Sequence, residues 1–336
     1  MLKKLGKYEI LREIGKGAMG VVYEGNDDVK MRIVAIKAIR KSTVAQSEVK
    51  EVFSRFRREA QVAGSLNHRN IVRVYTYGEE GDVAYIAMER IHGTELLNLI
   101  DSGKPFTAEE VNYIMGQLLD ALQYSHERRV VHRDIKPANL FLTNEGVIKI
   151  VDFGIAKIES SILTAAGFVL GSPFYMSPEQ YVGNQIDGRS DLYSAGVLMY
   201  QLLTGSLPLI GKDISETIQK VMHEMPQPPS RIKPENVTPE MDAVVMKALA
   251  KYPEERYQSA AEFAHAIRLA AGPDSPPVDI AHITAMPETR PEQQQYNNAI
   301  QSQHIEAVFG EMTRARMAEF EKQLAGLRET YNKKIN

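Results

Sequence analysis

The stretch from His132 to Asn139, together with Asp152 a short distance further on, holds polar side chains at short and fixed spacing. Asp134 could orient and deprotonate a hydroxyl group, and Lys136 could place a positive charge on a migrating phosphate. Asn139 and Asp152 could supply the hard oxygen ligands that a magnesium ion prefers. The segment therefore holds a candidate for each part that phosphoryl transfer needs.

Two complete motifs carry this chemistry: His-Arg-Asp-Ile-Lys-Pro-Ala-Asn at 132–139 and Asp-Phe-Gly at 152–154. His-Arg-Asp or Asp-Phe-Gly alone could also consist of ordinary core and turn residues, since Asp and Asn are common in turns. Together they resemble the catalytic-loop and metal-loop signatures of the eukaryotic-type (Hanks-type) protein kinases, in particular the bacterial members. The resemblance implies an α+β fold with two lobes, a small antiparallel β lobe with one main helix and a larger, mostly helical lobe.

Apolar runs on either side must position these polar groups. Val130 and Val131 come before the first motif, and residues 147–151 come before the second. Both runs have the composition of short buried strands. We therefore expect the polar side chains to lie in loops between strands.

Composition sets broad limits on the chain. Its 336 residues suffice for two or three lobes or domains, and a net charge of −3 gives no large basic field that would favour nucleic acid. The sequence contains no cysteine, which removes disulfides and thiolate metal sites. No apolar run approaches a membrane span, so we expect a cytoplasmic chain. Many bacterial relatives carry a membrane span after the kinase domain, and this chain could be part of something longer.

A glycine cluster lies between two alternating apolar runs over residues 8–24. Gly15, Gly17 and Gly20 predict a hairpin whose turn can lie close over a phosphate chain. The spacing also occurs in dinucleotide-binding folds, where a helix follows the glycines. Here the strand-like Val21-Val22-Tyr23 follows, which favours the kinase version.

A lysine within an apolar run comes next, in Val-Ala-Ile-Lys at 34–37. The resemblance implies that Lys37 holds the α- and β-phosphates of ATP. It also selects Glu59, in the helical stretch 46–66, as the carboxylate that fixes this lysine. The alternative for Glu59 is an ordinary surface pair with a neighbouring arginine.

Other contacts of the nucleotide rest on the resemblance alone. It implies that Val22 and Ala35 form the roof over adenine, that Phe141 forms its floor, that Met88 is the gatekeeper, and that Glu89 to Ile91 form the hinge. Glu95 lies where many relatives bind the ribose or a basic substrate residue. An acid in the first turn of a helix is an equal alternative for Glu95.

The segment from 152 to 179 has the composition of a regulatory loop. Arg133 marks, by resemblance, the class of kinases in which a phosphate on this loop pairs with an arginine cluster. Thr164 is our first candidate phosphosite, and Ser160 and Ser161 are the second. The threonine usual in this loop is replaced by Ser172, which keeps the hydroxyl group.

The end of this segment departs from the family pattern, because the usual Ala-Pro-Glu reads Ser-Pro-Glu at 177–179. The resemblance implies that Glu179 pairs with Arg256 at the base of the larger lobe. It also implies that Asp191 anchors the catalytic loop from below. As an alternative, Asp191 is simply an acid near the start of a helix.

The resemblance ends near Ala271 and gives a division of the chain. Residues 1–271 form the expected kinase domain, with lobes at about 8–91 and 92–271; residues 272–299 form a linker and 300–336 an amphipathic helical tail. The tail places Met317, Phe320, Leu324, Leu327 and Tyr331 on one stripe. It could dock on the kinase domain, pair with a second chain in a homodimer, or lead into a further segment.

The motifs together predict transfer of the γ-phosphoryl group of ATP, with Mg²⁺ or alternatively Mn²⁺, to a protein hydroxyl. Lys136 in Asp-x-Lys-Pro-x-Asn is the serine/threonine version of the motif, so we expect protein substrates with serine or threonine acceptors. A pseudokinase that only scaffolds partners is the competing hypothesis. It predicts the loss of at least one catalytic position, and Lys37, Glu59, Asp134, Asn139 and Asp152 are all present.

Overall fold

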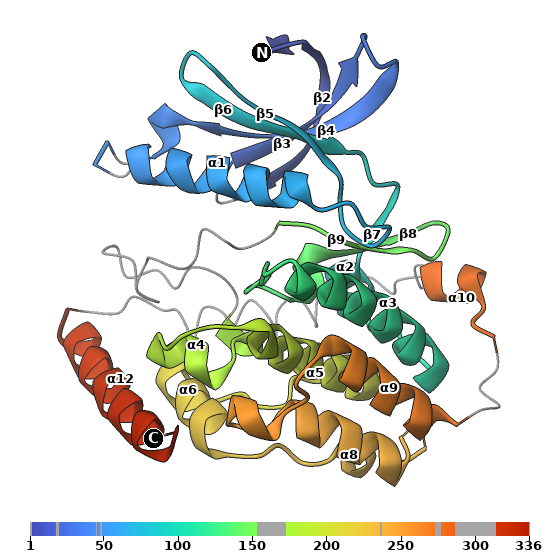
Figure 1. The fold of residues 1–336 in the computed structure, drawn as a ribbon, viewed down its shortest axis with the longest axis vertical. Helices are drawn as coiled ribbons and strands as arrows, with labels where there is room; N and C mark the ends of the chain where they lie inside the picture. Colours follow the sequence, from blue (N-terminus) through green and yellow to red (C-terminus); the bar gives the residue numbers. More distant parts are fainter. Residues whose placement is uncertain are drawn as a thin grey trace.

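The computed structural model describes residues 2–17, 20–44, 46–47, 49–152, 173–235, 237–272, 277–285 and 314–335. These residues form two lobes that lie one above the other in Figure 1. The upper lobe is a β-sheet with one long helix, and the lower lobe is mostly helical. The α+β, two-lobed fold expected from the sequence is confirmed.

The upper lobe is built on a six-stranded antiparallel sheet with strand order β1-β2-β3-β4-β6-β5. Its strands are β1 (Lys4–Leu5), β2 (Tyr8–Gly17), β3 (Gly20–Asp27), β4 (Arg32–Arg40), β5 (Val74–Glu80) and β6 (Val83–Glu89). Helix α1 (Val49–Ser65) buries Phe53, Phe56 and Ala60 against this sheet. The predicted glycine hairpin is present, because Gly17 on β2 pairs with Gly20 on β3.

A small three-stranded sheet joins the lobes, with order β7-β8-β9 (Gly93–Glu95, Leu140–Thr143, Ile148–Ile150). Below it lie the helices α2 (Leu96–Asp101), α3 (Ala108–Glu127), α4 (Pro178–Val182), α5 (Gly188–Thr204), α6 (Ile214–His223), α7 (Pro229–Ile232), α8 (Pro239–Ala248) and α9 (Ala260–Ala271). Helix α5 is buried from Ser190 to Thr204, which makes it the centre of the lower lobe.

The helix starts and stops follow the signals in the sequence. Thr107 and Glu110 form a capping box at the start of α3. The side chains of Thr238 and Ser259 accept hydrogen bonds from backbone N–H groups in the first turns of α8 and α9. Helix α5 ends at Gly205, whose φ of 77° is in the left-handed region that favours glycine.

Two predicted strands differ in the structure. Val130 and Val131 are not a strand: the Val130 N–H donates to the Ser125 carbonyl at 2.9 Å, so this run closes the C-terminal end of α3. The apolar run from Asn70 to Tyr77 also predicts a strand, but β5 begins at Val74. The residues before it bond instead to the small sheet, since Ile71 forms a parallel bridge with Ile150.

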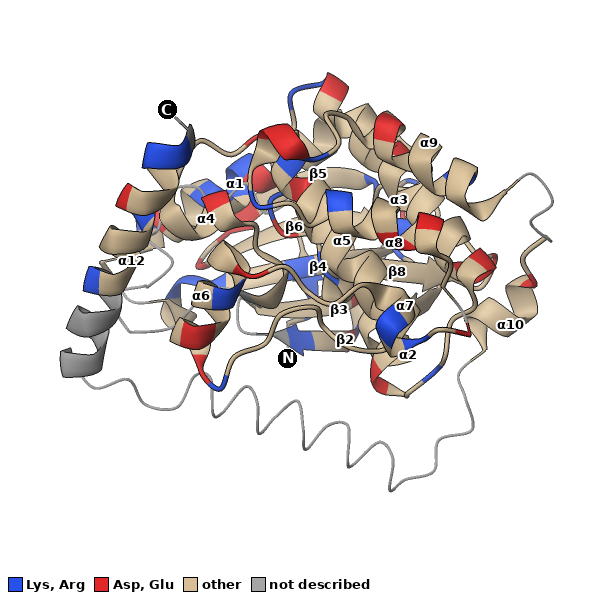
Figure 2. Cartoon of the chain, turned by 90° about the horizontal axis from the view of Figure 1, so that it is seen from below, with Lys and Arg blue, Asp and Glu red and all other residues tan. Residues whose placement is uncertain are grey.

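The chain after α9 returns to the lower lobe in two places. Helix α10 (Ile280–Thr284) falls within the expected linker, and its Ile283 is fully buried. Helix α12 (Arg314–Ile335) falls within the expected tail and lies beside α4. Figures 1 and 2 place α10 and α12 at opposite edges of the lower lobe. In the part of the chain that the structure describes, no helix has the length and apolar character needed to cross a membrane.

Candidate active site

The loop that carries Asp134 is anchored from below by Asp191. The Asp191 carboxylate accepts the backbone N–H groups of His132 at 2.8 Å and Arg133 at 2.7 Å, and it lies 2.7 Å from His126 Nε2. Burial works to raise the pKa of Asp191, but these hydrogen bonds and the nearby histidines hold it below its ordinary value. An ionised, buried carboxylate therefore fixes a loop in which Arg133 takes a positive φ of 68°.

His132 is a buried connector rather than a surface acid or base. Its Nδ1 accepts the Asp134 N–H at 3.2 Å, so its Nε2 carries the proton and donates to the Val151 carbonyl at 3.1 Å. Burial lowers the pKa of His132, in keeping with a neutral ring. The ring thus ties the loop of Asp134 to the segment that leads into Asp152.

The Asp134 carboxylate lies between two donors. Asp134 Oδ2 is 3.0 Å from Lys136 Nζ and accepts a hydrogen bond from Asn139 Nδ2 at 2.9 Å. The same Asn139 amide donates to the Asp134 carbonyl at 2.8 Å. The short helical turn Pro137–Asn139 brings these side chains together, so sequence neighbours form one polar cluster.

Lys37 forms the second cluster, with the two acids that the sequence proposed for this region. Lys37 Nζ lies 2.8 Å from Asp152 Oδ1 and 3.7 Å from Glu59 Oε1. Burial works to lower the pKa of Lys37, but the charges of Asp152 and Glu59 raise it above its ordinary value. The structure thus places Glu59 beside Lys37 and not in a surface pair with arginine.

Glu59 is the most perturbed acid of this cluster. Burial raises the pKa of Glu59 to about 7, the charge of Lys37 works to lower it, and that of Asp152 works to raise it. The carboxylates of Asp152 and Glu59 compete for the Lys37 ammonium. Glu59 lies farther from it and is therefore protonated more easily. A perturbed carboxylate of this kind is typical of a functional cleft.

The expected nucleotide contacts lie on adjoining strands around this cluster. Val22 pairs with Lys37 across β3 and β4, and Ala35 pairs with Met88 across β4 and β6. Gly15 on β2 lies opposite Val22. A Cβ atom at Gly20 would meet the Ala38 carbonyl oxygen at 2.2 Å, so the strand after the glycine turn admits no larger residue there.

The remaining contacts lie where β6 leaves the upper lobe and on the small sheet. The Glu89 N–H donates to the Arg73 carbonyl at 2.8 Å, and the Glu89 carboxylate is 2.7 Å from Lys149 Nζ. Ile91 follows two residues later and is half-buried. Phe141 lies on β8, opposite Glu95 on β7. Burial raises the pKa of Glu95, and the charge of Asp152 adds to this effect.

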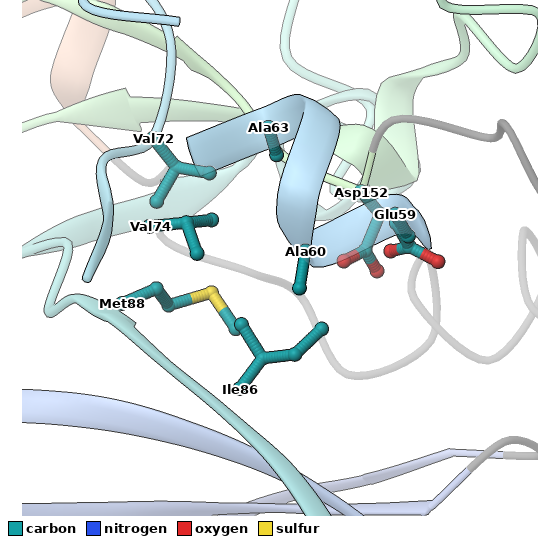
Figure 3. Close-up of a pocket in the computed structure, with 8 residues that line it drawn as sticks. All are labelled: Glu59, Ala60, Ala63, Val72, Val74, Ile86, Met88 and Asp152. Atoms are coloured by element: carbon teal, nitrogen blue, oxygen red, sulfur yellow. The ribbon is translucent and has the colours of Figure 1, made fainter. Parts of the chain in front are cut away.

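A pocket opens behind Met88, between α1 and the sheet (Figure 3). Glu59 and Asp152 lie side by side at one end of it, and the other lining residues are apolar: Ala60, Ala63, Val72, Val74, Ile86 and Met88. The sequence had indicated only the two acids and Met88. The small residues Ala60 and Ala63 follow Phe56 on one face of α1, which is the signal that could have found them.

The donor set suits a divalent metal held together with phosphate oxygens. The Asn139 amide nitrogen is occupied by Asp134, which leaves its side-chain oxygen as an acceptor. Asp152 Oδ1 faces Lys37, and the Asp152 side chain is 42% exposed. The Val151 N–H donates to the Asn139 carbonyl at 2.9 Å and so ties the two candidate ligands together. Mg²⁺ is usually held by one or two protein oxygens plus phosphates and water.

The candidate phosphosites Thr164, Ser160 and Ser161 lie outside the described residues, as does Ser172. Arg133, the residue expected to receive a phosphate, is described. Its Nη1 is buried and has no hydrogen-bond partner among the described residues, and burial lowers its pKa.

The base of the lower lobe contains the expected pair of Glu179 and Arg256. Two parallel hydrogen bonds of 2.8 Å join the guanidinium and carboxylate groups. Arg256 is 1% exposed and Glu179 is 3% exposed. Burial works to raise the pKa of Glu179, but the bonds to Arg256 and Ser190 hold it below its ordinary value.

Sequence reasoning missed Gln180 and His126, which both support the catalytic loop. Gln180 Nε2 donates to the Arg133 carbonyl at 2.9 Å, and His126 bonds to Asp191. The signal for Gln180 was the capping box that it forms with Ser177 at the start of α4. These polar contacts and the two-lobed fold define the class: a protein kinase.

Comparison with known proteins agrees with this class. The family model of the protein kinase domain matches residues 8–267. A probable serine/threonine-protein kinase of Streptomyces coelicolor is 44% identical over 264 residues, covering 76% of this chain and 39% of the relative. The serine/threonine-protein kinase PknB of Mycolicibacterium smegmatis is 40% identical over 282 residues, covering 81% and 44%. PrkC of Bacillus subtilis, also a serine/threonine-protein kinase, is 40% identical over 271 residues, covering 80% and 41%.

The chain therefore belongs to the protein kinase domain family, and the three relatives named above are bacterial proteins named as serine/threonine-protein kinases. The resemblance stated from the motifs is confirmed. The chain spans about two fifths of the length of these relatives.

Proposed function

We propose that this chain is a serine/threonine protein kinase that transfers the γ-phosphoryl group of ATP to protein hydroxyls. The observation that carries the proposal is the arrangement of Asp134, held between Lys136 and Asn139. The hydrogen bond from the Val151 N–H to the Asn139 carbonyl ties this cluster to the segment that carries Asp152, the partner of Lys37. The family and the names of the relatives support the same activity. Residues 1–271 would form the catalytic unit.

In this mechanism Asp134 accepts the proton of the incoming serine or threonine hydroxyl. The hydroxyl oxygen forms a bond to the γ-phosphorus while the bond from that phosphorus to the bridging oxygen of ADP breaks. Lys136, 3.0 Å from Asp134, lies where it can place a positive charge beside the transferred group. Lys37, fixed by two carboxylates, would hold the α- and β-phosphates.

Asn139 and Asp152 would hold the metal ion, which supplies charge neutralisation at the phosphates when it is bound. We propose Mg²⁺ as this ion, on the ground of the hard oxygen donors that the two side chains offer, with Mn²⁺ as an alternative. Gly15, Gly17 and Gly20 would cover the phosphates. Met88 and the segment from Glu89 to Ile91 would contact adenine, with Val22 and Ala35 above and Phe141 below.

Regulation by phosphorylation belongs to the proposal. The buried Nη1 of Arg133, which has no hydrogen-bond partner in the described part of the chain, supports an anionic partner, and Thr164 is the first candidate, with Ser160 or Ser161 second. A phosphate there would gain charge-assisted hydrogen bonds and order the segment. An enzyme of this kind acts where ATP is abundant, so we propose the cytoplasm as its location. We propose proteins with serine or threonine acceptors as its substrates.

The direct test replaces the proposed base. Asp134→Asn keeps the size of the side chain but removes the proton acceptor, so we expect turnover on myelin basic protein to fall about 10²-fold or more. The assay follows label from γ-labelled ATP into the protein. Asp120→Asn, an exposed carboxylate on α3, is the matched control and should be unchanged. Equal turnover in Asp134→Asn and the wild type would contradict the role of Asp134.

A further inference from the structure

Helix α12 presents a single stripe to the lower lobe. Leu327 and Tyr331 are 8% and 3% exposed, and Leu324 packs beside them against the same core. The residues between them, from Arg328 to Thr330, are exposed. Figures 1 and 2 both show α12 lying beside α4. Of the three possibilities for the tail, the structure shows docking on the kinase domain.

Two polar contacts of α12 fall on the C-terminal end of α4. Arg328 Nε donates to the Val182 carbonyl, one of the carbonyls that the end of a helix leaves without a partner. Asn184 Nδ2 donates to Asn332 Oδ1 at 2.7 Å. Gly183 has a φ of +66°, and a Cβ atom there would lie 2.5 Å from Arg328 Nη2. This glycine therefore ends α4 and also makes room for the guanidinium.

Tyr331 lies against the buried pair of Glu179 and Arg256. Its hydroxyl donates to the Lys251 carbonyl at 3.1 Å, and the same carbonyl accepts Arg256 Nη2 at 2.9 Å. The Tyr331 ring stacks on Tyr252 with centroids 5.5 Å apart. Burial raises the pKa of the Tyr331 phenol, so it stays a hydrogen-bond donor. Tyr331 is thus linked to the ion pair of Glu179 and Arg256 through one shared backbone carbonyl.

Helix α4 is thereby held from two sides. Glu179 in its first turn pairs with Arg256, and Gln180 donates to the Arg133 carbonyl of the catalytic loop. Its other end is held by Arg328 of α12. The contacts of α12 named here are with α4, Lys251 and Tyr252, not with the catalytic side chains. They are suited to support the site rather than to block it.

We propose that α12 is a positioning element of the kinase, in which Tyr331 and Arg328 hold α4 and, through Glu179 and Gln180, the catalytic loop. The inference rests on the proposed function, since it assigns these residues to the same reaction. Tyr331 and Arg328 touch neither nucleotide nor acceptor in this account. They act on turnover through the position of the loop that carries Asp134.

The test compares full-length variants. Tyr331→Ala and Arg328→Ala should raise hydrogen exchange of the Gly183 and Asn184 amides about tenfold, because the end of α4 opens more often. Turnover on myelin basic protein should fall about 3- to 10-fold, the effect of losing about one hydrogen bond. The KM for ATP should change less than about twofold, since the contacts of Lys37 are untouched.

Two further variants make the comparison specific. Lys333→Ala removes a cation from the exposed face of α12, where Lys333 pairs only with Glu329 among the contacts described, and should match the wild type. Tyr331→Phe keeps the stack on Tyr252 and should recover most of the turnover. If Tyr331→Ala proves unstable, Arg328→Ala carries the test alone, since its side chain is at the surface.

Three outcomes would overturn the proposal. Unchanged turnover with faster exchange would show that α12 packs on α4 without affecting catalysis. Raised turnover would show that the tail inhibits. A dimer in light scattering that Tyr331→Ala dissociates would show that these contacts join two chains. Absence of transfer in the wild type and in Lys333→Ala would instead contradict the proposed function, whatever the exchange at α4.

Discussion

At the scale of single residues, charge is balanced by pairing rather than by exposure. Lys37 faces two acids, Asp134 faces one lysine, and Asp191 is ionised although it is fully buried. The buried carboxylates of Asp191 and Glu179 both accept hydrogen bonds, because a buried charge without a partner would cost several kcal/mol. The charge of Glu59 is compensated less completely, because Lys37 lies closer to Asp152 than to Glu59.

Glu59→Gln should therefore stabilise the ligand-free protein while lowering its activity. The native pKa of Glu59 is about 7, above the ordinary 4.5, so the native state binds the proton more tightly and stability is lost as pH rises from about 4.5 to 7. The neutral glutamine removes this cost, roughly 1 to 3 kcal/mol at pH 8. Urea unfolding at pH 8 and pH 5.5 measures it.

The gain from Glu59→Gln should be largest at pH 8 and smaller at pH 5.5. Glu51→Gln, an exposed acid on the same helix, serves as control and should show little dependence on pH. A variant less stable than the wild type at pH 8 would show that Lys37 stabilises the Glu59 carboxylate more than burial destabilises it.

The sequence identified the candidate catalytic residues better than the residues that hold the catalytic loop in place. Asp134, Lys136, Asn139 and Asp152 lie in two contiguous motifs, so their types and spacing could be read directly. Gln180 and His126 could not, because each supports the loop from a distant helix and neither residue type is specific. The perturbed pKa of Glu59 likewise depends on burial, which spacing alone does not reveal.

At the scale of elements, one carboxylate in the first turn of α3 both caps that helix and contacts α10. Glu110 is buried, and its Oε2 accepts the Thr107 N–H at 2.9 Å, while its Oε1 lies 2.7 Å from His282 Nδ1 on α10. One carboxylate thus completes the capping box and holds α10. The cap could be predicted from local sequence, whereas a contact across 172 residues could not.

Substitutions in the capping box should separate these two roles. Thr107→Ala should lower the free energy of unfolding by about 1 kcal/mol, the usual cost of losing an N-cap, and leave α10 in place. Glu110→Ala should also raise hydrogen exchange over Ile280–Thr284. Glu109→Ala is the neighbouring control. The same exchange at α10 in Glu110→Ala and Thr107→Ala would refute a link between the cap and α10.

Contacts between elements also explain why the strand predicted at Val130 and Val131 was wrong. Val130 and Val131 have strand-like composition, but the chain turns at Arg129, whose φ is 60°, and the two valines close α3 instead. Local propensity could not show that the end of this helix needed them. Boundaries of this kind are set by tertiary contacts.

At the scale of the whole molecule, the two lobes meet at the clusters of Lys37 and Asp134, and the chain after α9 holds the lower lobe at both edges (Figures 1 and 2). The two lobes were expected from the resemblance to the protein kinases, which rests on the motifs. The position of the tail did not follow. An apolar stripe shows that a helix must be covered, but not by what.

The proposed reaction of the whole molecule is phosphoryl transfer by this site to serine or threonine hydroxyls. It is tested most directly by intact-mass and peptide mass spectrometry of the chain, dephosphorylated and then incubated with Mg-ATP and myelin basic protein, beside Asp152→Ala. Phosphate should appear on serine or threonine residues, and only with the intact site, because the variant lacks a metal ligand. Equal phosphate in Asp152→Ala, or none on either protein, would contradict the account.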